Sequence, residues 1–162
     1  MKQPLGTGGG AVLRPGGAPW MVDEVLGLPG AVVADRTMHD HVNGWDEGPP
    51  FTMPVFAVTH WPHPVRVAGA TTFTLVPGVE TAVVQAKAIA GGKNVYAGGG
   101  ASVAGQALRP GLVDELSIHI EPVLPGGGAR LPDDLGTSPI RLERTRLTEA
   151  EPATHPRYRV RR

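Results

Sequence analysis

Short apolar segments separated by glycine-rich turns run through the middle of the chain, and this pattern most constrains the fold. Four such segments lie at residues 31–34, 55–58, 73–76 and 94–97. Brief runs that are largely apolar are typical of strands buried on both faces of a parallel sheet. We therefore expect these segments to be strands of one central sheet.

Helical periodicity follows the third of these segments. Residues 79–90 (VETAVVQAKAIA) consist mostly of good helix formers and end at two glycines. The helical repeat of about 3.6 residues places Val83, Ala86 and either Ala90 or Ile89 on the buried face.

A second helix is predicted to begin near Ser102, after three consecutive glycines at residues 98–100. Strands that alternate with helices in this way indicate βαβ units. The predicted fold class is therefore α/β with a mainly parallel sheet.

The last third of the chain follows a different pattern. Residues 113–123 alternate between apolar and polar side chains, as do residues 140–147 and 157–160. Strict alternation predicts antiparallel strands with one wetter face. We expect the last two segments to form a closing hairpin across residues 149–156.

Glycine and proline mark the start of the chain as a separate segment. The sequence has 23 glycines and 17 prolines in 162 residues, and they crowd into a few stretches, the first of which is residues 4–19. We predict an irregular segment over residues 1–19, a short helix over 20–26, and one domain over 20–162.

Composition excludes several function classes. Lys and Arg total 15 and so do Asp and Glu, which leaves no net charge to attract nucleic acid or anionic membranes. Cysteine is absent, so neither disulfides nor thiolate chemistry is available. No segment approaches a membrane-spanning length, and we expect a cytoplasmic protein.

Several stretches together resemble a known family. The segments AVVADRT, VFAVTHWP, TTFTLV, VETAVVQAKAIAGGKNVYAGGGAS and GGGASVAGQALRPGLVDELSIHIEPVLPGGGARL occur in the order and spacing of the dihydrofolate-reductase-like proteins related to the C-terminal reductase domain of riboflavin biosynthesis. The resemblance covers roughly residues 21–162. It implies a three-layer fold, with a mostly parallel central sheet, helices on both faces and an antiparallel C-terminal edge.

The resemblance implies an NADPH-dependent reductase. The reaction would be of the 5-amino-6-(5-phosphoribosylamino)uracil reductase type, with hydride transfer to a small carbonyl or imine substrate. The alternative is a truncated, non-catalytic relative that binds a nucleotide or dimerises. The family also implies a homodimer, for which residues 113–123 are a candidate surface.

The glycines before the second predicted helix are the first candidate cofactor site. Glycines between a strand and a helix let the backbone approach a pyrophosphate, which the N–H groups of the helix N-terminus favour. The resemblance assigns phosphate contacts to Gly99 and Gly100, with Ala101 and Ser102 beside them. The competing interpretation is a tight turn with Ser102 as a helix cap.

Asp35 and Arg36 follow the first predicted strand and form the second candidate site. The family sequence here is Gly-Arg-x-Thr, which contacts the cofactor phosphates, and Arg36 matches it. Asp35 replaces the glycine and Met38 replaces the threonine. A carboxylate would repel phosphate and adds a Cβ where close approach is needed. An exposed Asp–Arg turn is the alternative.

Thr59 and His60 end the strand at residues 55–58. The family has a hydroxyl residue and then a basic residue at this place, beside the adenosine ribose. Thr59 could donate to a phosphate oxygen, and His60 adds charge when protonated. An ordinary strand-to-loop transition is the competing interpretation.

Other polar groups carry weaker signals. Adjacent Asp114 and Glu115 suit a structural role, such as capping or pairing with an arginine, better than acid–base chemistry. The short histidine pairs His39–His41 and His60–His63 lack a third ligand at zinc-like spacing. We therefore predict no metal site.

Family members usually begin with a strand that reads roughly Ser-Leu-Asp-Gly-Phe and lines the nicotinamide and substrate side of the cleft. No segment of this sequence matches that strand. We expect the chain to lack it, and we assign no catalytic residue for that reason.

Overall fold

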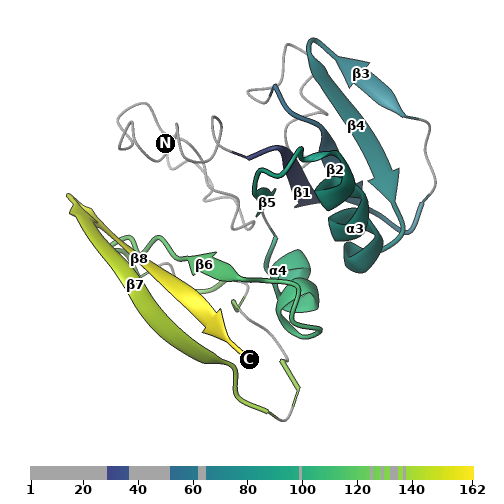
Figure 1. The fold of residues 1–162 in the computed structure, drawn as a ribbon. Coiled ribbons are helices and arrows are strands. Elements are labelled where there is room, and N and C mark those ends of the chain that lie inside the picture. The colour runs from purple at the N-terminus through teal and green to yellow at the C-terminus, as the bar shows by residue number, and fades with distance from the viewer. Residues whose placement is uncertain are drawn as a thin grey trace.

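Two β-sheets and two helices make up the described part of the chain. The computed structural model describes residues 29–36, 52–61, 65–98, 100–124, 126–128, 130–131, 135–136 and 138–162. A five-stranded sheet has the order β3-β4-β2-β1-β5, and a three-stranded sheet has the order β6-β8-β7 (Figure 1). The elements are β1 (Ala31–Asp35), β2 (Val55–Val58), β3 (Arg66–Ala68), β4 (Thr71–Val76), α3 (Val79–Ile89), β5 (Val95–Ala97), α4 (Ala101–Leu108), β6 (Glu115–Ser117), β7 (Arg141–Ala150) and β8 (Ala153–Arg161).

The larger sheet is parallel except at one edge. Strand β1 pairs in parallel with β2 and with β5, and β2 pairs in parallel with β4. These four strands are the apolar segments predicted above. Strand β3 pairs antiparallel with β4 and was not predicted, because it begins with Arg66 and forms no apolar run. The predicted helix over 20–26 and the domain boundary at residue 20 lie outside the described residues.

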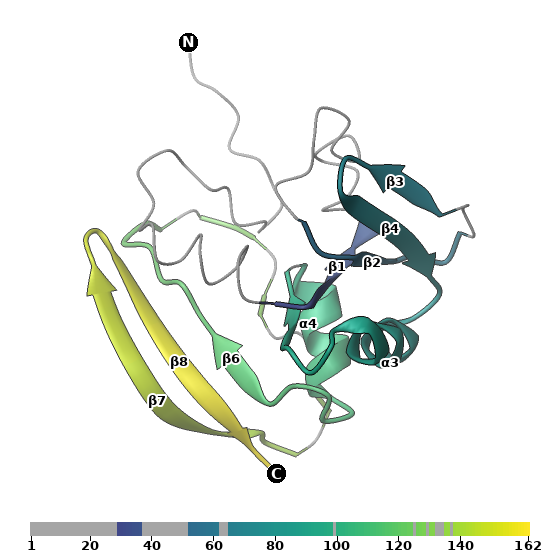
Figure 2. The ribbon, with the colours of Figure 1, turned by 45° about the horizontal axis from the view of Figure 1, so that its top comes forward.

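Strand β1 is the centre of the core and is buried on both faces. Its residues alternate between two clusters, with Val33 on the face that carries α3 and α4 and Val32 on the opposite face with Phe73 and Val55. Both described helices lie on the same face of the parallel sheet (Figure 2). Helices were predicted on both faces of the sheet. Among the described residues, helices cover one of these faces.

Helix α3 buries the side predicted from its periodicity. Val79, Ala82, Val83 and Ala86 are buried, as is Ala90 just beyond the helix, whereas the side chain of Ile89 is 51% exposed. The alternative left open between Ala90 and Ile89 is therefore decided for Ala90.

Across the described residues, none of the helices combines the length and apolarity that spanning a membrane requires.

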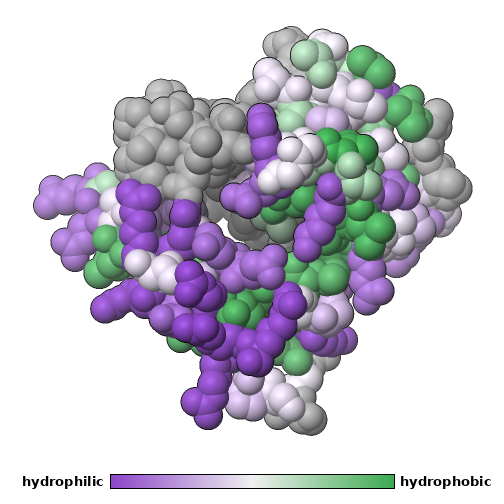
Figure 3. Space-filling view, viewed as in Figure 1, coloured by the Kyte–Doolittle hydropathy of each residue, from purple (hydrophilic) through white to green (hydrophobic). Residues whose placement is uncertain are grey.

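The three-stranded sheet contains the predicted hairpin, with a shorter turn than expected. Strands β7 and β8 pair from Arg141–Arg161 to Ala150–Ala153, so only Glu151 and Pro152 form the turn. Hydrophilic side chains predominate over this sheet in the view of Figure 3. Strand β7 is exposed along most of its length, including its apolar residues Leu142 (43%) and Leu147 (45%), so the predicted division into one buried and one wetter face is not met in this strand.

Strand β6 is shorter than the alternation over 113–123 predicts. It ends at Ser117, and pairing with β8 returns only as an isolated bridge between Ile120 and Thr154. The reason is Pro156 of β8, whose carbonyl accepts the N–H of Ile118 at 3.0 Å. Proline has no N–H to donate in return, so the ladder is interrupted at this point.

A histidine pair lies at the interruption. Nδ1 of His119 is 2.6 Å from Nδ1 of the buried His155, with the two rings at 62° to each other. One nitrogen must donate and the other accept, so the contact holds at most one proton between them. Partial burial lowers the pKa of His119 and the neighbouring His155 lowers it further, while Glu121 opposes these effects.

The histidine pair predicts that the fold loses stability in acid. Because the folded-state pKa of His119 lies below its unfolded value, the unfolded chain binds more protons as pH falls past about 6.5. The stability that the protein gains from a neutral His119 is present above that pH and is lost below it. We expect the melting temperature to drop between about pH 7.5 and about pH 5.5, and the drop to be smaller in His119→Gln. An unchanged pH dependence in that variant would contradict the assignment.

Candidate functional site

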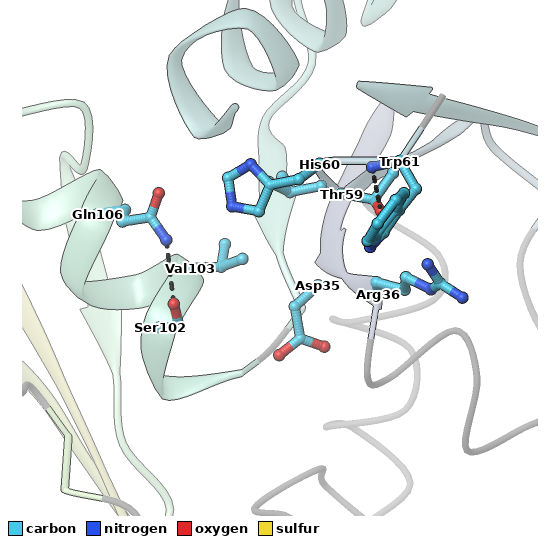
Figure 4. Close-up of a pocket in the computed structure, with 9 residues that line it drawn as sticks. Asp35, Arg36, Thr59, His60, Trp61, Ser102, Val103 and Gln106 are labelled. Atoms are coloured by element: carbon cyan, nitrogen blue, oxygen red, sulfur yellow. Dashed lines mark hydrogen bonds between the residues drawn. The ribbon is translucent and has the colours of Figure 1, made fainter. Parts of the chain in front are cut away.

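One pocket opens at the carboxyl ends of β1 and β2, beside the first turns of α4. In an α/β sheet this is the edge at which ligands bind, because adjacent parallel strands deliver their following loops to one place. The pocket has a volume of about 260 Å³. Figure 4 shows the side chains that converge on it. The lining residues are Asp35, Arg36, Val58, Thr59, His60, Trp61, Ser102, Val103 and Gln106.

Asp35 and Arg36 reach the pocket from the end of β1. Asp35 is the last residue of the strand, in register with Val58 of β2, and both Asp35 and Arg36 are half-buried. In Figure 4 the Asp35 carboxylate points towards the chain entering α4, and the Arg36 guanidinium extends away on the other side. The two opposite charges therefore reach different parts of the pocket.

Thr59 is the buried member of the β2 segment. Its side chain is 7% exposed, and its N–H donates to the carbonyl of Val76 at 2.8 Å. The Trp61 N–H donates to Thr59 Oγ1 at 3.2 Å, which turns the chain sharply after the strand. His60 and Trp61 are consequently held at the pocket rim with exposed side chains, Trp61 at 68%.

The N-terminus of α4 is capped by glycine rather than by serine. Gly100 is the N-cap residue, with φ 51° and ψ 146°, and it offers no side chain to bond the free N–H groups of this end. Ser102 lies within the first turn, where its Oγ accepts a hydrogen bond from Gln106 Nε2 at 3.0 Å. The interpretation of Ser102 as the cap is therefore wrong, because Ser102 has already entered the helix.

Four of the predicted cofactor residues come together in the pocket. Arg36, Thr59, His60 and Ser102 line it, although they derive from three separate segments. Gly100 and Ala101 lead into α4 beside it without lining it. Gly99 lies outside the described residues.

Four of the lining residues were not predicted from the sequence: Val58, Trp61, Val103 and Gln106. Gln106 follows Ser102 by four residues, which places both on one face of α4, and this spacing was the available signal. Val103 is 2% exposed and belongs to the core, so it supplies an apolar wall. Trp61 carried no helical or strand pattern that pointed to the pocket.

The other polar residues singled out in the sequence lie away from the pocket or outside the described residues. Asp114 Oδ1 lies 3.3 Å from Arg162 Nη2, and the Asp114 carbonyl accepts the N–H of Val160 at 2.9 Å. This agrees with the predicted pairing with an arginine. Among the residues described, no group of three acidic, histidine or cysteine side chains could hold a metal ion. His39, His41 and His63 lie outside them.

The chemistry of the pocket suits an anionic ligand, with one exception. Arg36 offers a permanent guanidinium, His60 an imidazole, and the α4 N-terminus the positive end of a helix dipole. The exception is Asp35, which places a carboxylate among these groups. The volume is slightly below the roughly 300–1,000 Å³ of pockets that enclose a whole small ligand, so it fits part of an extended one.

Comparisons with known proteins agree with this architecture. Among solved structures, the chain resembles a protein assigned to riboflavin biosynthesis from Shewanella sp. PV-4, with TM-score 0.68 and 22% identity over 92% of this chain and 84% of that one. It also resembles a pyrimidine reductase-like protein from Corynebacterium diphtheriae, with TM-score 0.56 and 14% identity over 83% and 77% of the two chains.

A third similar structure is dihydrofolate reductase from Enterococcus faecalis complexed with NADP(H) and a compound named RAB-propyl. It has TM-score 0.60 and 14% identity over 88% of this chain and 80% of that one. These likenesses confirm the predicted dihydrofolate-reductase-like α/β fold. No curated protein sequence matches the chain significantly.

The protein-family model described as the RibD C-terminal domain matches residues 54–155. The match covers well over half of the chain and includes β2, α3, α4 and most of the pocket. The protein therefore belongs to the RibD C-terminal domain family, the riboflavin-biosynthesis type of dihydrofolate-reductase-like reductases.

Proposed function

We propose that the protein is an NADPH-dependent reductase that transfers hydride to a small carbonyl or imine substrate. The observation that carries the proposal is that Arg36, His60 and Ser102 of the first turn of α4 line one pocket. NADPH would supply the hydride, and the chain would bind and orient it. The candidate substrate class is the ring-opened ribose of 5-amino-6-(5-phosphoribosylamino)uracil, which follows from the family.

Each residue has a role in this proposal. Arg36 would hold a phosphate of the cofactor, since a guanidinium can donate two parallel hydrogen bonds to it. Thr59 and Ser102 would donate hydroxyl hydrogen bonds, and His60 would add positive charge in its protonated form. Gly99, Gly100 and Ala101 would let the backbone approach the pyrophosphate.

An alternative function is nucleotide binding without catalysis. Asp35 counts against efficient NADPH-dependent turnover, because a carboxylate in the pocket opposes tight binding of the negatively charged cofactor. Oxidation of NADPH in the presence of a panel of small aldehydes, ketones and imines distinguishes the two. Substrate-dependent oxidation supports the reductase, and binding without oxidation supports the alternative.

Titration with NADPH is the direct test of cofactor binding. Trp61 at the pocket rim should report it through quenching of tryptophan fluorescence, although the chain has three tryptophans. The matched variant Trp61→Phe should bind NADPH with a smaller fluorescence change. Absence of saturable binding at millimolar NADPH, with no rise in melting temperature, would contradict the proposal.

Replacing Arg36 with alanine should weaken NADPH binding by about ten- to a hundredfold, because a charge-assisted hydrogen bond to phosphate contributes roughly 1.5–3 kcal/mol. Arg36→Lys should recover part of the loss, since it keeps the charge and loses the second hydrogen bond. Arg130→Ala removes an exposed arginine that does not line the pocket and should leave binding unchanged. Equal affinities in all three variants would remove Arg36 from the site.

We also propose a homodimer through the edge of β6. This strand lies at the edge of its sheet, and within the described residues no strand pairs with its outer side. Ile120, Val123 and Leu124 beyond it are exposed by 54%, 66% and 99%. Light scattering should give twice the mass of the 162-residue chain, and a monomer at high protein concentration would exclude this arrangement.

A further inference from the structure

The carboxylate of Asp35 covers Gly100 at the start of α4. A Cβ placed on Gly100 would lie 2.6 Å from Cγ of Asp35 and closer still to Oδ2. Figure 4 shows the carboxylate directed at the chain that enters α4. Two segments that lie far apart in sequence are thus in direct contact beside the pocket.

The carboxylate lies where an anion would be attracted. The first turn of α4 contains no acidic residue, and its N-cap glycine has no side chain to bond the free N–H groups. Those groups and the helix dipole make the N-terminus favourable to negative charge. Asp35 supplies such a charge from a neighbouring strand, and the end of that strand is held in register against Val58 of β2.

We propose that Asp35 is a built-in occupant of the phosphate position and sets how strongly the pocket binds phosphate-bearing ligands. This rests on the proposed cofactor function. A phosphate that approaches Gly100 meets a like charge and must displace the Asp35 side chain. The side chain has two rotatable bonds, so a phosphate can displace it at the cost of the contacts that the carboxylate makes, and Asp35 therefore lowers the affinity without closing the pocket.

Asp35→Asn tests this inference because it removes the charge and keeps the shape. The expected result is binding of NADPH and of inorganic pyrophosphate about tenfold tighter than in the wild type, with the gain reduced at high salt. Asp35→Ser is the second variant, neutral and smaller, and should show the same direction. Melting temperatures establish that each variant is folded.

Asp114→Asn is the matched control. It removes one negative charge from an exposed residue outside the pocket, so the net charge of the protein changes equally. Its affinity for both ligands should stay within about twofold of the wild type, because exposed distant charges are screened. A gain as large as that of Asp35→Asn would attribute the effect to net charge and overturn the inference.

The two ligands separate this inference from the proposed function. If NADPH binds equally to wild type and Asp35→Asn, the cofactor site stands and the role of Asp35 is overturned. If no variant binds NADPH but Asp35→Asn binds pyrophosphate more tightly, the cofactor function fails and the role of Asp35 stands. If folded Asp35→Asn binds neither ligand, both are overturned.

Discussion

Replacing Phe73 with alanine should lower the free energy of unfolding by about 3–5 kcal/mol, the range for deleting a fully buried phenylalanine. Phe73 is 0% exposed and is the largest fully buried side chain of the described core. It packs with Val32, Val55 and Met53 on the face of the parallel sheet opposite α3. Its strand is paired on both sides, so the backbone cannot collapse into the cavity easily.

Denaturant unfolding measures this loss. The control is Val67→Ala on β3, whose side chain is 68% exposed, and its effect should stay within about 0.5 kcal/mol. A loss below about 1 kcal/mol for Phe73→Ala would mean that the opposite face of the sheet is not a packed core.

Replacing Gly100 with alanine should both destabilise the fold and remove NADPH binding. Gly100 has φ 51° and ψ 146°, a conformation that costs other residues about 1–3 kcal/mol. The new Cβ would also overlap the Asp35 carboxylate and fill the place where a phosphate would meet the backbone. Unlike the Asp35 side chain, a Cβ cannot rotate away, so the block is permanent.

Two further variants separate strain from obstruction. Gly91 has φ 62°, and a Cβ added to it would have no atom within 4 Å, so Gly91→Ala should destabilise the protein and leave NADPH binding intact. Gly100→Ala combined with Asp35→Asn should remain unable to bind, since the obstruction persists without the charge. Normal binding by folded Gly100→Ala would show that the cofactor does not approach this glycine.

The residues at the pocket were predictable in part. Arg36, Thr59 and His60 were identified because each follows a predicted strand and matches the family pattern. Trp61 and Gln106 were not assigned, since neither a strand ending nor a family motif pointed to them. Gly99 remains a prediction.

The sequence by itself determined the regular elements of this fold. The apolar runs that became β1, β2, β4 and β5 and the helical repeat of α3 are visible within each segment, because the spacing of apolar side chains shows which of them must be buried. Glycine pairs and triplets marked the helix ends in the same local way.

Only the tertiary structure decided the features that join distant segments. Pro156 ends β6 because it lies opposite Ile118, and no pattern within either segment shows that pairing. Asp35 contacts Gly100 because β1 and α4 pack against each other. The aspartate that replaces the family glycine therefore places a negative charge at the N-terminus of α4. Local periodicity carries no information about which carboxylate reaches which backbone across the core, because packing between elements sets that geometry.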